Sequence, residues 1–419
     1  MASIYFVSTY KPILCGIADY LNFLLKEVSP ARWKVISFNL KNYVASGDRL
    51  TKEKKESPKQ VWYGITNRRS PSFKEILKGI KKLAKKDEKI VLWFQHTFGI
   101  WRNSRAFARC LKELNKLKIP IVVTLHTLHF QSEHTIFGLE DRKKNEYDFL
   151  KLIFPYVSAV TVFSEGCYLA IKKAFPEYIS KTFIIKHGIH YFQEIIKMPK
   201  EAARKKIYQF LINKSNLPRK QKAEIKKEDI FGGQDILLLG QAGFVVRHKN
   251  AEKLFLMRDL LQEIVPEKKV VAVYIGVPRE NEKNKIKYAL KLRGFHNGKN
   301  KFFLETWLPE ELLPVFQKSL DINFYWPQKC TQSGMLAHIF GTGNLVAGRD
   351  MEGSGEMLKE AGQIADKDFQ KLALKIKKNI SSHTLIEKTG KKALAYAKKY
   401  SWKNQAIKHY QLAKRIATK

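Results

Sequence analysis

The stretch SIYFVSTYKPILCGIADYLNFLLKEV, residues 3–28, combines a short apolar strand, a loop that ends in Gly16, and an amphipathic helix. Residues 3–8 form the expected strand, 9–16 the loop and 17–28 the helix. A strand that runs through a short loop into a helix is the repeating unit of parallel sheets, and the free N–H groups at such a helix start attract anions. The stretch therefore predicts a doubly wound α/β domain with an anion site after its first strand.

The same alternation of strands and helices continues along the chain. Helix 70–86, SPSFKEILKGIKKLAKK, has apolar residues on one face and lysines on the other, which is typical of a helix that covers a sheet. After about residue 230 a second series of strands begins with DILLLGQAG at 235–243. The pattern predicts two parallel sheets. The other expected strands are 33–38, 89–95, 119–126, 159–164 and 181–188 in the first series, and 270–276, 301–305, 321–326 and 344–348 in the second.

The division into domains follows from these two series. A chain of 419 residues is too long for one ordinary core and suits two domains of similar size. Residues 191–232 show no strand pattern and are rich in Lys and Arg, which predicts a basic, partly helical linker with a mobile section at 214–227. We therefore expect an N-terminal domain at 1–190 and a C-terminal domain at 233–401. The carboxyl ends of the strands in the two domains are expected to face each other across a cleft.

The charge balance is unusual, with 77 Lys and Arg against 39 Asp and Glu, a formal net charge of +38. Adaptation to heat raises Glu together with Lys, so it does not explain this imbalance. Two explanations remain: a lysine-biased composition on solvated helix faces, or attraction to nucleic acid or an anionic membrane. We favour a biased composition that is used at a membrane, through helix 70–86 and the linker lysines. No helix-turn-helix, RNA-recognition or zinc pattern supports nucleic acid as a partner.

The cysteines and the apolar runs bear on the compartment. Cys15, Cys110, Cys167 and Cys330 are scattered, with neither metal-ligand spacing nor a disulfide framework. No apolar run is long enough for a bilayer, and the first residues lack the pattern of a signal peptide. Apolar residues make up 44% of the chain, which is enough for two cores. We expect a cytoplasmic protein, with peripheral attachment to the inner face of the cell membrane as an extension of the charge argument.

Three loops between a strand and a helix are candidate anion sites, at 9–19, 240–250 and 331–336. In the second, Arg247 and Lys249 could hold a diphosphate and stabilise the charge that develops as it leaves. From composition alone, two surface bases in a basic chain are the simpler explanation.

The third loop contains Gln332, Ser333 and Gly334 at an expected helix start. A serine there commonly caps the helix. The alternative is that its hydroxyl and the following N–H groups bind phosphate.

Histidines end three expected strands: His96, His126 and His187. The carboxyl end of a strand in an α/β fold lies at the rim of the ligand-binding cleft, but a packed core histidine is an equally good interpretation of His96 and His126. His187 with Gly188 indicates a turn before the linker.

Asp366 and Asp368 form an Asp-x-Asp pattern, which in some transferases binds a metal ion that bridges a diphosphate. Here the pattern directly precedes a helix, so capping of that helix is the better explanation and no metal site is expected. The chain contains no HExxH, Walker A or GxSxG pattern.

Taken together, these segments resemble glycosyltransferase family 4, a large family of retaining transferases with the two-domain GT-B fold. The resemblance runs nearly end to end and rests on order and spacing. It implies that the last helix, 402–419, crosses back to an acceptor-side N-terminal domain, while the C-terminal domain binds a nucleotide sugar. The segments that carry it are STYKPILCGIADYLNFLL (8–25), QHTFGIW (95–101), TLHTLH (124–129), FSEG (163–166), IIKHGI (184–189), GFVVRHKN (243–250), WLPEELLPVFQKSLDINFYWP (307–327), TQSGMLAHIFGTGNLVAG (331–348) and YSW (400–402).

The resemblance also implies roles for individual residues. Gly16 takes the place of the glycine that approaches the donor phosphates, and His126 that of the residue that contacts the donor sugar. Lys249 takes the place of the lysine that binds the diphosphate, with Arg247 as its companion. The remaining nucleotide contacts that the resemblance implies are Gly243, Leu308, Gln332, Ser333, Gly334 and Met335.

One departure from the family pattern concerns ribose recognition. Many members carry two glutamates eight positions apart around the diphosphate helix, whereas Cys330 and His338 stand there in this chain. The chain is similar to a branch that has Ser-Gly in this loop and lacks the pair. Either ribose recognition differs or activity has been lost. Glu352 and Glu356 are candidates for sugar or ribose contact, with a surface loop as the alternative.

The resemblance implies metal-independent transfer of a sugar with retention of configuration. The expected donor is UDP- or GDP-linked and the expected acceptor is a saccharide or a lipid-linked molecule, in cell-surface polysaccharide or glycolipid synthesis. Two alternatives stay open. One is a nucleotide-sugar epimerase with the same fold, and the other is a non-catalytic, degenerate binding protein.

Overall fold

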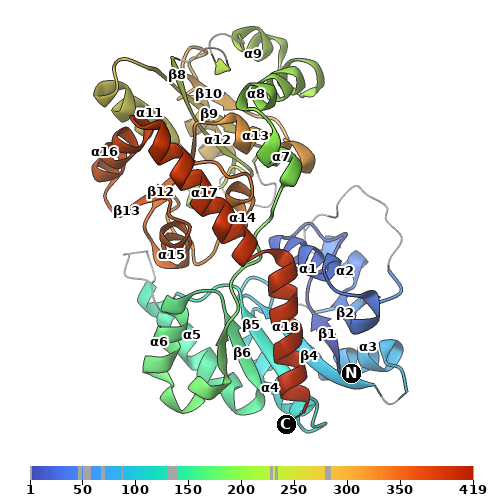
Figure 1. Cartoon of the computed structure of the whole chain (residues 1–419). Helices are drawn as coiled ribbons and strands as arrows, with labels where there is room; N and C mark the ends of the chain where they lie inside the picture. The colour runs from blue at the N-terminus through green and yellow to red at the C-terminus, as the bar shows by residue number, and fades with distance from the viewer. Residues whose placement is uncertain are drawn as a thin grey trace. The chain divides into compact units, whose positions relative to one another are not determined.

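The computed structural model describes residues 2–45, 50, 58–67, 71–86, 88–129, 139–226, 230–231, 235–278 and 285–418. The chain divides into two compact units. Unit 1 comprises Met1–Gly188 and Tyr400–Lys419, and unit 2 comprises Ile189–Lys399. Each unit is built around one parallel β-sheet with helices packed on it (Figure 1).

Unit 1 contains a seven-stranded sheet in the order β3-β2-β1-β4-β5-β6-β7, with all neighbours parallel. The order reverses between β1 and β4, so the loops that follow these two strands leave toward opposite faces of the sheet. The six expected strands of this half are confirmed, with shifts at their ends; β3 was not expected. The strands are β1 (Ala2–Val7), β2 (Trp33–Phe38), β3 (Val61–Ile65), β4 (Lys89–His96), β5 (Ile121–Leu125), β6 (Ala159–Val162) and β7 (Thr182–Ile184).

Both faces of this sheet are covered by apolar side chains of the helices. Leu21 of α1 and Ala413 of α18 belong to the core on one face, and Ile76 of α3 and Phe107 of α4 to the core on the other. The C-terminal helix α18 is therefore part of unit 1, as the resemblance implied. The helices of unit 1 are α1 (Gly16–Lys26), α2 (Leu40–Ala45), α3 (Phe73–Leu83), α4 (Ser104–Asn115), α5 (Leu139–Ile153), α6 (Glu165–Ala174) and α18 (Trp402–Ala417).

Helix α3 has the two faces that its sequence pattern predicts. Ile76 and Ile80 are buried against the core, whereas Lys74, Lys78 and Lys81 are exposed. The apolar stripe thus stabilises unit 1, and the lysines face solvent.

Unit 2 contains a six-stranded parallel sheet in the order β10-β9-β8-β11-β12-β13. The order reverses between β8 and β11, which is the second switch point of the chain. The five expected strands are confirmed and β13 is additional. The strands are β8 (Ile236–Ala242), β9 (Lys269–Ile275), β10 (Lys301–Leu304), β11 (Ile322–Tyr325), β12 (Val346–Arg349) and β13 (Ile364–Asp366).

The helices that precede and surround this sheet include most of the segment expected as a linker. They are α7 (Gln193–Lys197), α8 (Lys200–Gln209), α9 (Arg219–Glu224), α11 (Glu252–Ile264), α12 (Lys285–Arg293), α13 (Leu313–Ser319), α14 (Gly334–Phe340), α15 (Glu352–Glu360), α16 (Phe369–Ile380) and α17 (His383–Lys399).

The structure places the segment 191–226 within unit 2 and not between two domains. Ala203 and Ile207 of α8 are fully buried in a core that also contains Leu238 of β8. Arg204 donates to the carboxylate of Asp321 at 2.8 Å, which anchors the helix to the sheet. The basic composition conceals these apolar positions, because they recur at helical spacing among many lysines. Residues 227–229 and 232 of the expected linker lie outside the described part.

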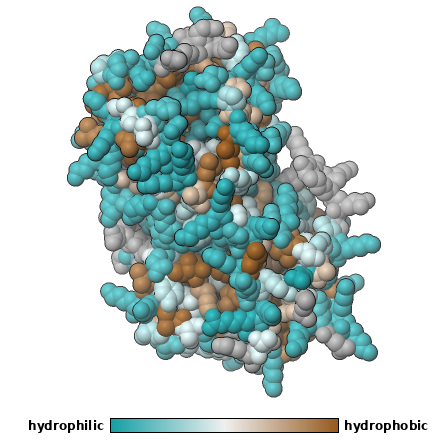
Figure 2. All heavy atoms as spheres, in the orientation of Figure 1, coloured by the Kyte–Doolittle hydropathy of each residue, from teal (hydrophilic) through white to brown (hydrophobic). Residues whose placement is uncertain are grey.

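Hydrophilic side chains dominate the face of the molecule that Figure 2 shows. Among the described helices, none combines the length and the apolar character needed to cross a bilayer.

Candidate functional site

A tight turn after β8 is the most constrained loop of unit 2. Gly243 has a φ of +119°, a conformation that residues with a side chain rarely adopt. Its N–H donates to the carbonyl of Ile275 at 2.9 Å. The hydroxyl of Tyr274 donates to the carbonyls of Gly243 and Phe244, each at 3.1 Å. The turn therefore lies directly on β9, at the carboxyl end of the sheet.

The side chain of Lys249 lies over this glycine. A Cβ added to Gly243 would be 2.6 Å from the Lys249 Nζ and 3.3 Å from the Cε of Met335. Met335 belongs to the first turn of α14, and the amide of Gln317 contacts its sulfur at 3.2 Å. The fold thus brings together three residues that the resemblance assigns to donor binding: Gly243 and Lys249 from the loop after β8, and Met335 from the start of α14. A lysine ammonium group beside a partly exposed turn at a switch point can attract an anion.

The start of α14 shows the capping role of Ser333. Its hydroxyl accepts from the N–H of Leu336 at 3.2 Å. Gly334 is exposed, and a Cβ added to it would meet no atom within 4 Å. The space beside the helix start is therefore open, and the phosphate-binding role of Gln332, Ser333 and Gly334 stays a prediction.

Cys330 and His338 stand where glutamates were expected from the family pattern. The Cys330 sulfur lies 3.0 Å from the Tyr325 hydroxyl oxygen and 3.2 Å from the carbonyl oxygen of Gln332, and burial raises the pKa of the thiol. The His338 ring stacks on His190 at 4.1 Å, and burial lowers its pKa to about 4. Both side chains are therefore uncharged at neutral pH, so neither replaces the negative charge of a glutamate.

The other residues of unit 2 that the sequence singled out differ in exposure and in hydrogen bonding. Arg247 is exposed, and Leu308 packs against the core that contains α8. Glu352 begins α15 with a φ of +42°, which is uncommon for a residue with a side chain. The Asp368 carboxylate accepts from the N–H of Lys371 at 2.8 Å, so the predicted helix cap is confirmed. Asp366 pairs with Lys375 at 2.7 Å.

An aromatic pair beside the glycine turn was missed from the sequence. Trp307, in the loop after β10, is 51% exposed, and its ring lies 5.4 Å from that of Phe244. Both residues stand inside segments that carry the family resemblance. The signal that could have found them is the placement of two large rings at the carboxyl ends of strands, where ligand-binding side chains gather.

In unit 1, His126 belongs to an aromatic cluster at the carboxyl end of β5. Its Nε2 lies 2.6 Å from the Oε1 of Gln95, and its ring contacts the edge of Tyr20 at 5.0 Å. Burial, followed by the nearby His187, lowers its pKa to about 3, so the ring is neutral at neutral pH. Tyr20 also contacts Trp402 of α18. A neutral ring can exchange hydrogen bonds with a hydroxyl group without adding charge.

His96 and Gly16 have opposite environments. The His96 ring is fully buried and stacks on Phe149 at 4.2 Å, and within the described residues neither of its nitrogens has a hydrogen-bond partner. His96 is therefore a core residue. At Gly16, the first residue of α1, an added Cβ would meet no atom within 4 Å.

A second pair missed from the sequence lies just beyond β5. The Nδ1 of His129 is 2.8 Å from one carboxylate oxygen of Glu146, and the His129 N–H donates to the other oxygen at 2.6 Å. Glu146 is only 2% exposed. This pair fixes the loop after β5 beside His126. The Nδ1 of His187 lies 2.6 Å from the carbonyl oxygen of Gly188. The turn expected here is absent, because residues 185–188 continue past β7 without a turn.

No group of three metal-ligating side chains occurs within the described ranges.

Comparison with known proteins places this geometry in a wider context. No protein-family model matches the chain, and no curated protein matches it. Solved structures match it over its whole length. A UDP-forming α,α-trehalose-phosphate synthase from Burkholderia xenovorans has a TM-score of 0.69 at 14% identity, with 100% of both chains covered. The Anabaena protein Alr3699/HepE, in complex with UDP and glucose, has a TM-score of 0.65 at 14% identity, again with 100% of both chains covered.

The trehalose-6-phosphate synthase OtsA has a TM-score of 0.65 at 12% identity, with 99% of each chain covered. At these identities the matches establish the fold. The chain therefore has the GT-B fold, with two Rossmann-like units of seven and six parallel strands.

Proposed function

We propose that the chain is a glycosyltransferase that moves a sugar from a nucleoside-diphosphate donor to an acceptor. The observation that carries the proposal is the Lys249 ammonium group held against the backbone of Gly243, at the carboxyl end of β8. A positive charge there can bind a diphosphate and stabilise the additional negative charge that the diphosphate acquires as the sugar leaves. The GT-B fold supports the proposal, because the matched structures with this fold include sugar transferases.

The choice of substrates to test follows from the matched structures. HepE was solved with UDP and with UDP-glucose, and a Burkholderia xenovorans synthase was solved with glucose-6-phosphate. We propose a UDP-linked donor first and a GDP-linked donor second. The acceptor is a saccharide or a lipid-linked molecule, with a sugar phosphate as the form suggested by the Burkholderia synthase.

The mechanism proposed for this chain needs no protein nucleophile and no metal ion. The resemblance to family 4 implies that configuration is retained. Lys249, Arg247 and the start of α14 act on the leaving diphosphate. The neutral ring of His126 orients the donor sugar through a hydrogen bond.

A thermal-shift screen of UDP-, GDP- and ADP-sugars tests this proposal. We expect one nucleotide class to stabilise the chain, because a ligand that binds only the folded state raises the unfolding temperature. Product analysis with each acceptor class follows. If no nucleotide sugar raises the unfolding temperature, the proposal is wrong. Turnover of the donor without an acceptor favours an epimerase, and binding without any turnover favours a degenerate binding protein.

We further propose that the exposed lysines of α3 attach the chain to an anionic membrane. Lys78, Lys81 and Lys82 are exposed on the face opposite the buried stripe. Lysines near an anionic surface contribute about 1 kcal/mol each at low screening. We expect flotation with anionic liposomes and none with neutral ones.

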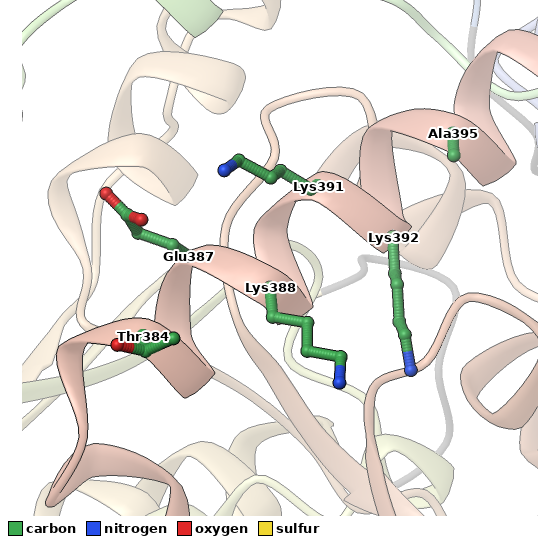
Figure 3. A pocket seen from close by; sticks show the side chains of 6 residues that line it. All are labelled: Thr384, Glu387, Lys388, Lys391, Lys392 and Ala395. Atoms are coloured by element: carbon green, nitrogen blue, oxygen red, sulfur yellow. The ribbon is translucent and has the colours of Figure 1, made fainter.

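Charge reversal on α3 localises this interaction. Replacing Lys78, Lys81 and Lys82 by Glu should abolish flotation. The control makes the same reversals at Lys388, Lys391 and Lys392 of α17, which line a shallow hollow of about 360 Å³ together with Thr384, Glu387 and Ala395 (Figure 3). Equal losses in the two variants would show that total charge acts and not the α3 surface.

A further inference from the structure

A buried hydrogen bond joins the carboxyl ends of two neighbouring strands of unit 1. Gln95 is the next-to-last residue of β4, and His126 directly follows β5. The Nε2 of His126 lies 2.6 Å from the Oε1 of Gln95. Gln95 is fully buried, and its backbone carbonyl accepts from the indole N–H of Trp101 at 2.9 Å. The backbone and the register of β4 beside β5 therefore fix where the amide group meets the ring.

This contact decides which nitrogen of His126 carries the ring proton. An amide oxygen only accepts hydrogen bonds, so the Nε2 of His126 is the donor. Burial lowers the pKa of His126 to about 3, so at neutral pH the ring has a single N–H proton. With that proton on Nε2, the Nδ1 has a lone pair and can accept a hydrogen bond but cannot donate one.

His126 differs in this respect from other histidines of unit 1. Three of them have their Nδ1 within hydrogen-bond distance of an oxygen that only accepts, either of a carboxylate or of a backbone carbonyl, so their proton is on Nδ1. The contacts are His129 to Glu146 at 2.8 Å, His187 to Gly188 at 2.6 Å and His409 to Gln405 at 2.7 Å. Gln95 is the group that gives His126 the opposite tautomer.

Aromatic neighbours fix the direction of the His126 ring. The ring of Tyr20 is nearly perpendicular to it, at 89°, with the centroids 5.0 Å apart, and the ring of Phe163 lies at 5.1 Å. Tyr20 is held from its other end, because its hydroxyl oxygen lies 3.4 Å from the Nε2 of His409. A ring whose direction and proton are both fixed is preorganised for one kind of hydrogen bond.

We propose that Gln95 is a positioning residue that holds the His126 proton on Nε2, so that Nδ1 accepts a hydrogen bond from a hydroxyl group of the donor sugar. The inference rests on the proposed function, in which His126 orients that sugar, and it adds the residue that sets the direction of the hydrogen bond. A nitrogen that only accepts favours a sugar with a hydroxyl group at this position over one whose group there cannot donate.

NMR of the ligand-free chain, carrying isotopically labelled histidine, measures the tautomer directly. His126→Gln identifies the signals of this ring by their loss. We expect the wild type to carry the proton on Nε2. Gln95→Met nearly keeps the side-chain volume but removes the acceptor. The ratio of the Nε2–H form to the Nδ1–H form should then fall by about 3- to 10-fold, which corresponds to the usual net contribution of one hydrogen bond.

Gln405→Met is the matched control. Gln405 is also fully buried in unit 1, and among the described residues neither atom of its side-chain amide has a hydrogen-bond partner. The same substitution there should leave the tautomer ratio of His126 unchanged. His129 is an internal reference in every spectrum, because its Nδ1 proton is held by Glu146 and not by Gln95.

Calorimetric titration with UDP-glucose and with UDP separates positioning from structural damage. We expect Gln95→Met to raise the Kd for UDP-glucose by about 3- to 10-fold and to leave the Kd for UDP unchanged, because only the sugar contacts His126. Gln405→Met should change neither Kd.

Three results would contradict the inference. One is a wild-type proton on Nδ1, which would mean that the Gln95 amide donates to the ring. Another is an equal tautomer ratio in Gln95→Met and the wild type, and the third is an equal loss of UDP and UDP-glucose binding. A failure of the proposed function is distinguishable: the wild type then binds neither UDP nor UDP-glucose, while the NMR measurement needs no ligand and still reports the tautomer.

Discussion

At the scale of single residues, Lys249 carries the largest share of the proposed chemistry. Its ammonium group is the positive charge that the fold holds against Gly243. We expect Lys249→Ala to lower the rate of sugar transfer by about 10²–10³, as the loss of one preorganised charge stabiliser does in other enzymes. The measurement is steady-state kinetics with the donor found by screening.

The control for this variant is Lys299→Ala, at an exposed position of the loop before β10. Its kinetics should match those of the wild type. An unchanged rate in Lys249→Ala would remove this residue from the mechanism.

Two glycines at the expected phosphate loops should respond differently to the same methyl group. Gly243→Ala places a Cβ 2.6 Å from the Lys249 Nζ at a φ of +119°, so we expect a lower unfolding temperature and weaker nucleotide binding. Gly16→Ala meets no protein atom, so its unfolding temperature should not fall. If a donor phosphate approaches Gly16, Gly16→Ala should lose activity while its unfolding temperature stays that of the wild type. Full activity in Gly16→Ala would exclude that contact.

The sequence predicted some residues of the site and not others, for physical reasons. Gly243 and Lys249 stand in one segment after a strand, so their proximity follows from local order. Phe244 and Trp307 belong to loops that only the sheet order brings together, because β8 and β10 are separated in the sequence but share β9 as a neighbour. His129 was missed for a similar reason, because its partner Glu146 lies in α5, a helix that was not predicted from the sequence.

At the scale of secondary-structure elements, the end of β4 makes unit 1 sensitive to acid. Burial lowers the pKa of His96 from 6.5 to about 3. The unfolded chain therefore binds a proton below pH 6.5 that the folded chain cannot bind until about pH 3. The stability contribution is fully present above pH 6.5 and is lost as the pH falls, by up to about 1.4 kcal/mol per pH unit.

We expect His96→Leu to remove this loss, because leucine keeps apolar contacts with Phe98, Phe107 and Phe149 and takes up no proton. Urea unfolding between pH 4.5 and 7.5 measures the slope. His383→Gln is the matched control, since this histidine is exposed on α17. Equal slopes in the wild type and His96→Leu would contradict a neutral, buried His96.

The docking of α18 depends on one large side chain. Trp402 is 6% exposed, contacts Tyr20 and Phe23, and leaves no room for a side chain at Gly188, where an added Cβ would lie 2.1 Å from its ring. We expect Trp402→Ala to lower the free energy of unfolding by about 3–5 kcal/mol. Ile407→Ala, on the exposed face of the same helix, should change it by less than about 0.5 kcal/mol. Comparable losses in both variants would show that the helix is not held by Trp402.

The elements of the fold were predictable where periodicity was strong. The long apolar strands β1, β4, β8 and β9 were evident because parallel strands buried on both faces consist almost wholly of apolar residues. Strand β3 was missed because VWYGI is short and only half-buried at the sheet edge. Helix α8 was assigned to a linker because its lysines outnumber the apolar positions that pack on the sheet.

At the scale of the whole molecule, the two strand-helix series predicted two parallel-sheet domains, and the resemblance to family 4 implied that they form the GT-B fold, which the matched structures confirm. The net charge of +38 was less informative, because exposed lysines are compatible with solvated helices as well as with an anionic partner. Donor base and acceptor are selected by a few loop side chains in proteins of this kind, and composition and periodicity carry no information about such side chains.

The most direct test of the account is a crystal structure of the chain grown with a nucleoside diphosphate. The quantity to measure is the distance from the Lys249 Nζ to the nearest phosphate oxygen. We predict about 3 Å, the length of a charge-assisted hydrogen bond, with the diphosphate beside the backbone of Gly243. A nucleotide bound elsewhere, with Lys249 beyond hydrogen-bond reach of its phosphates, would contradict the account.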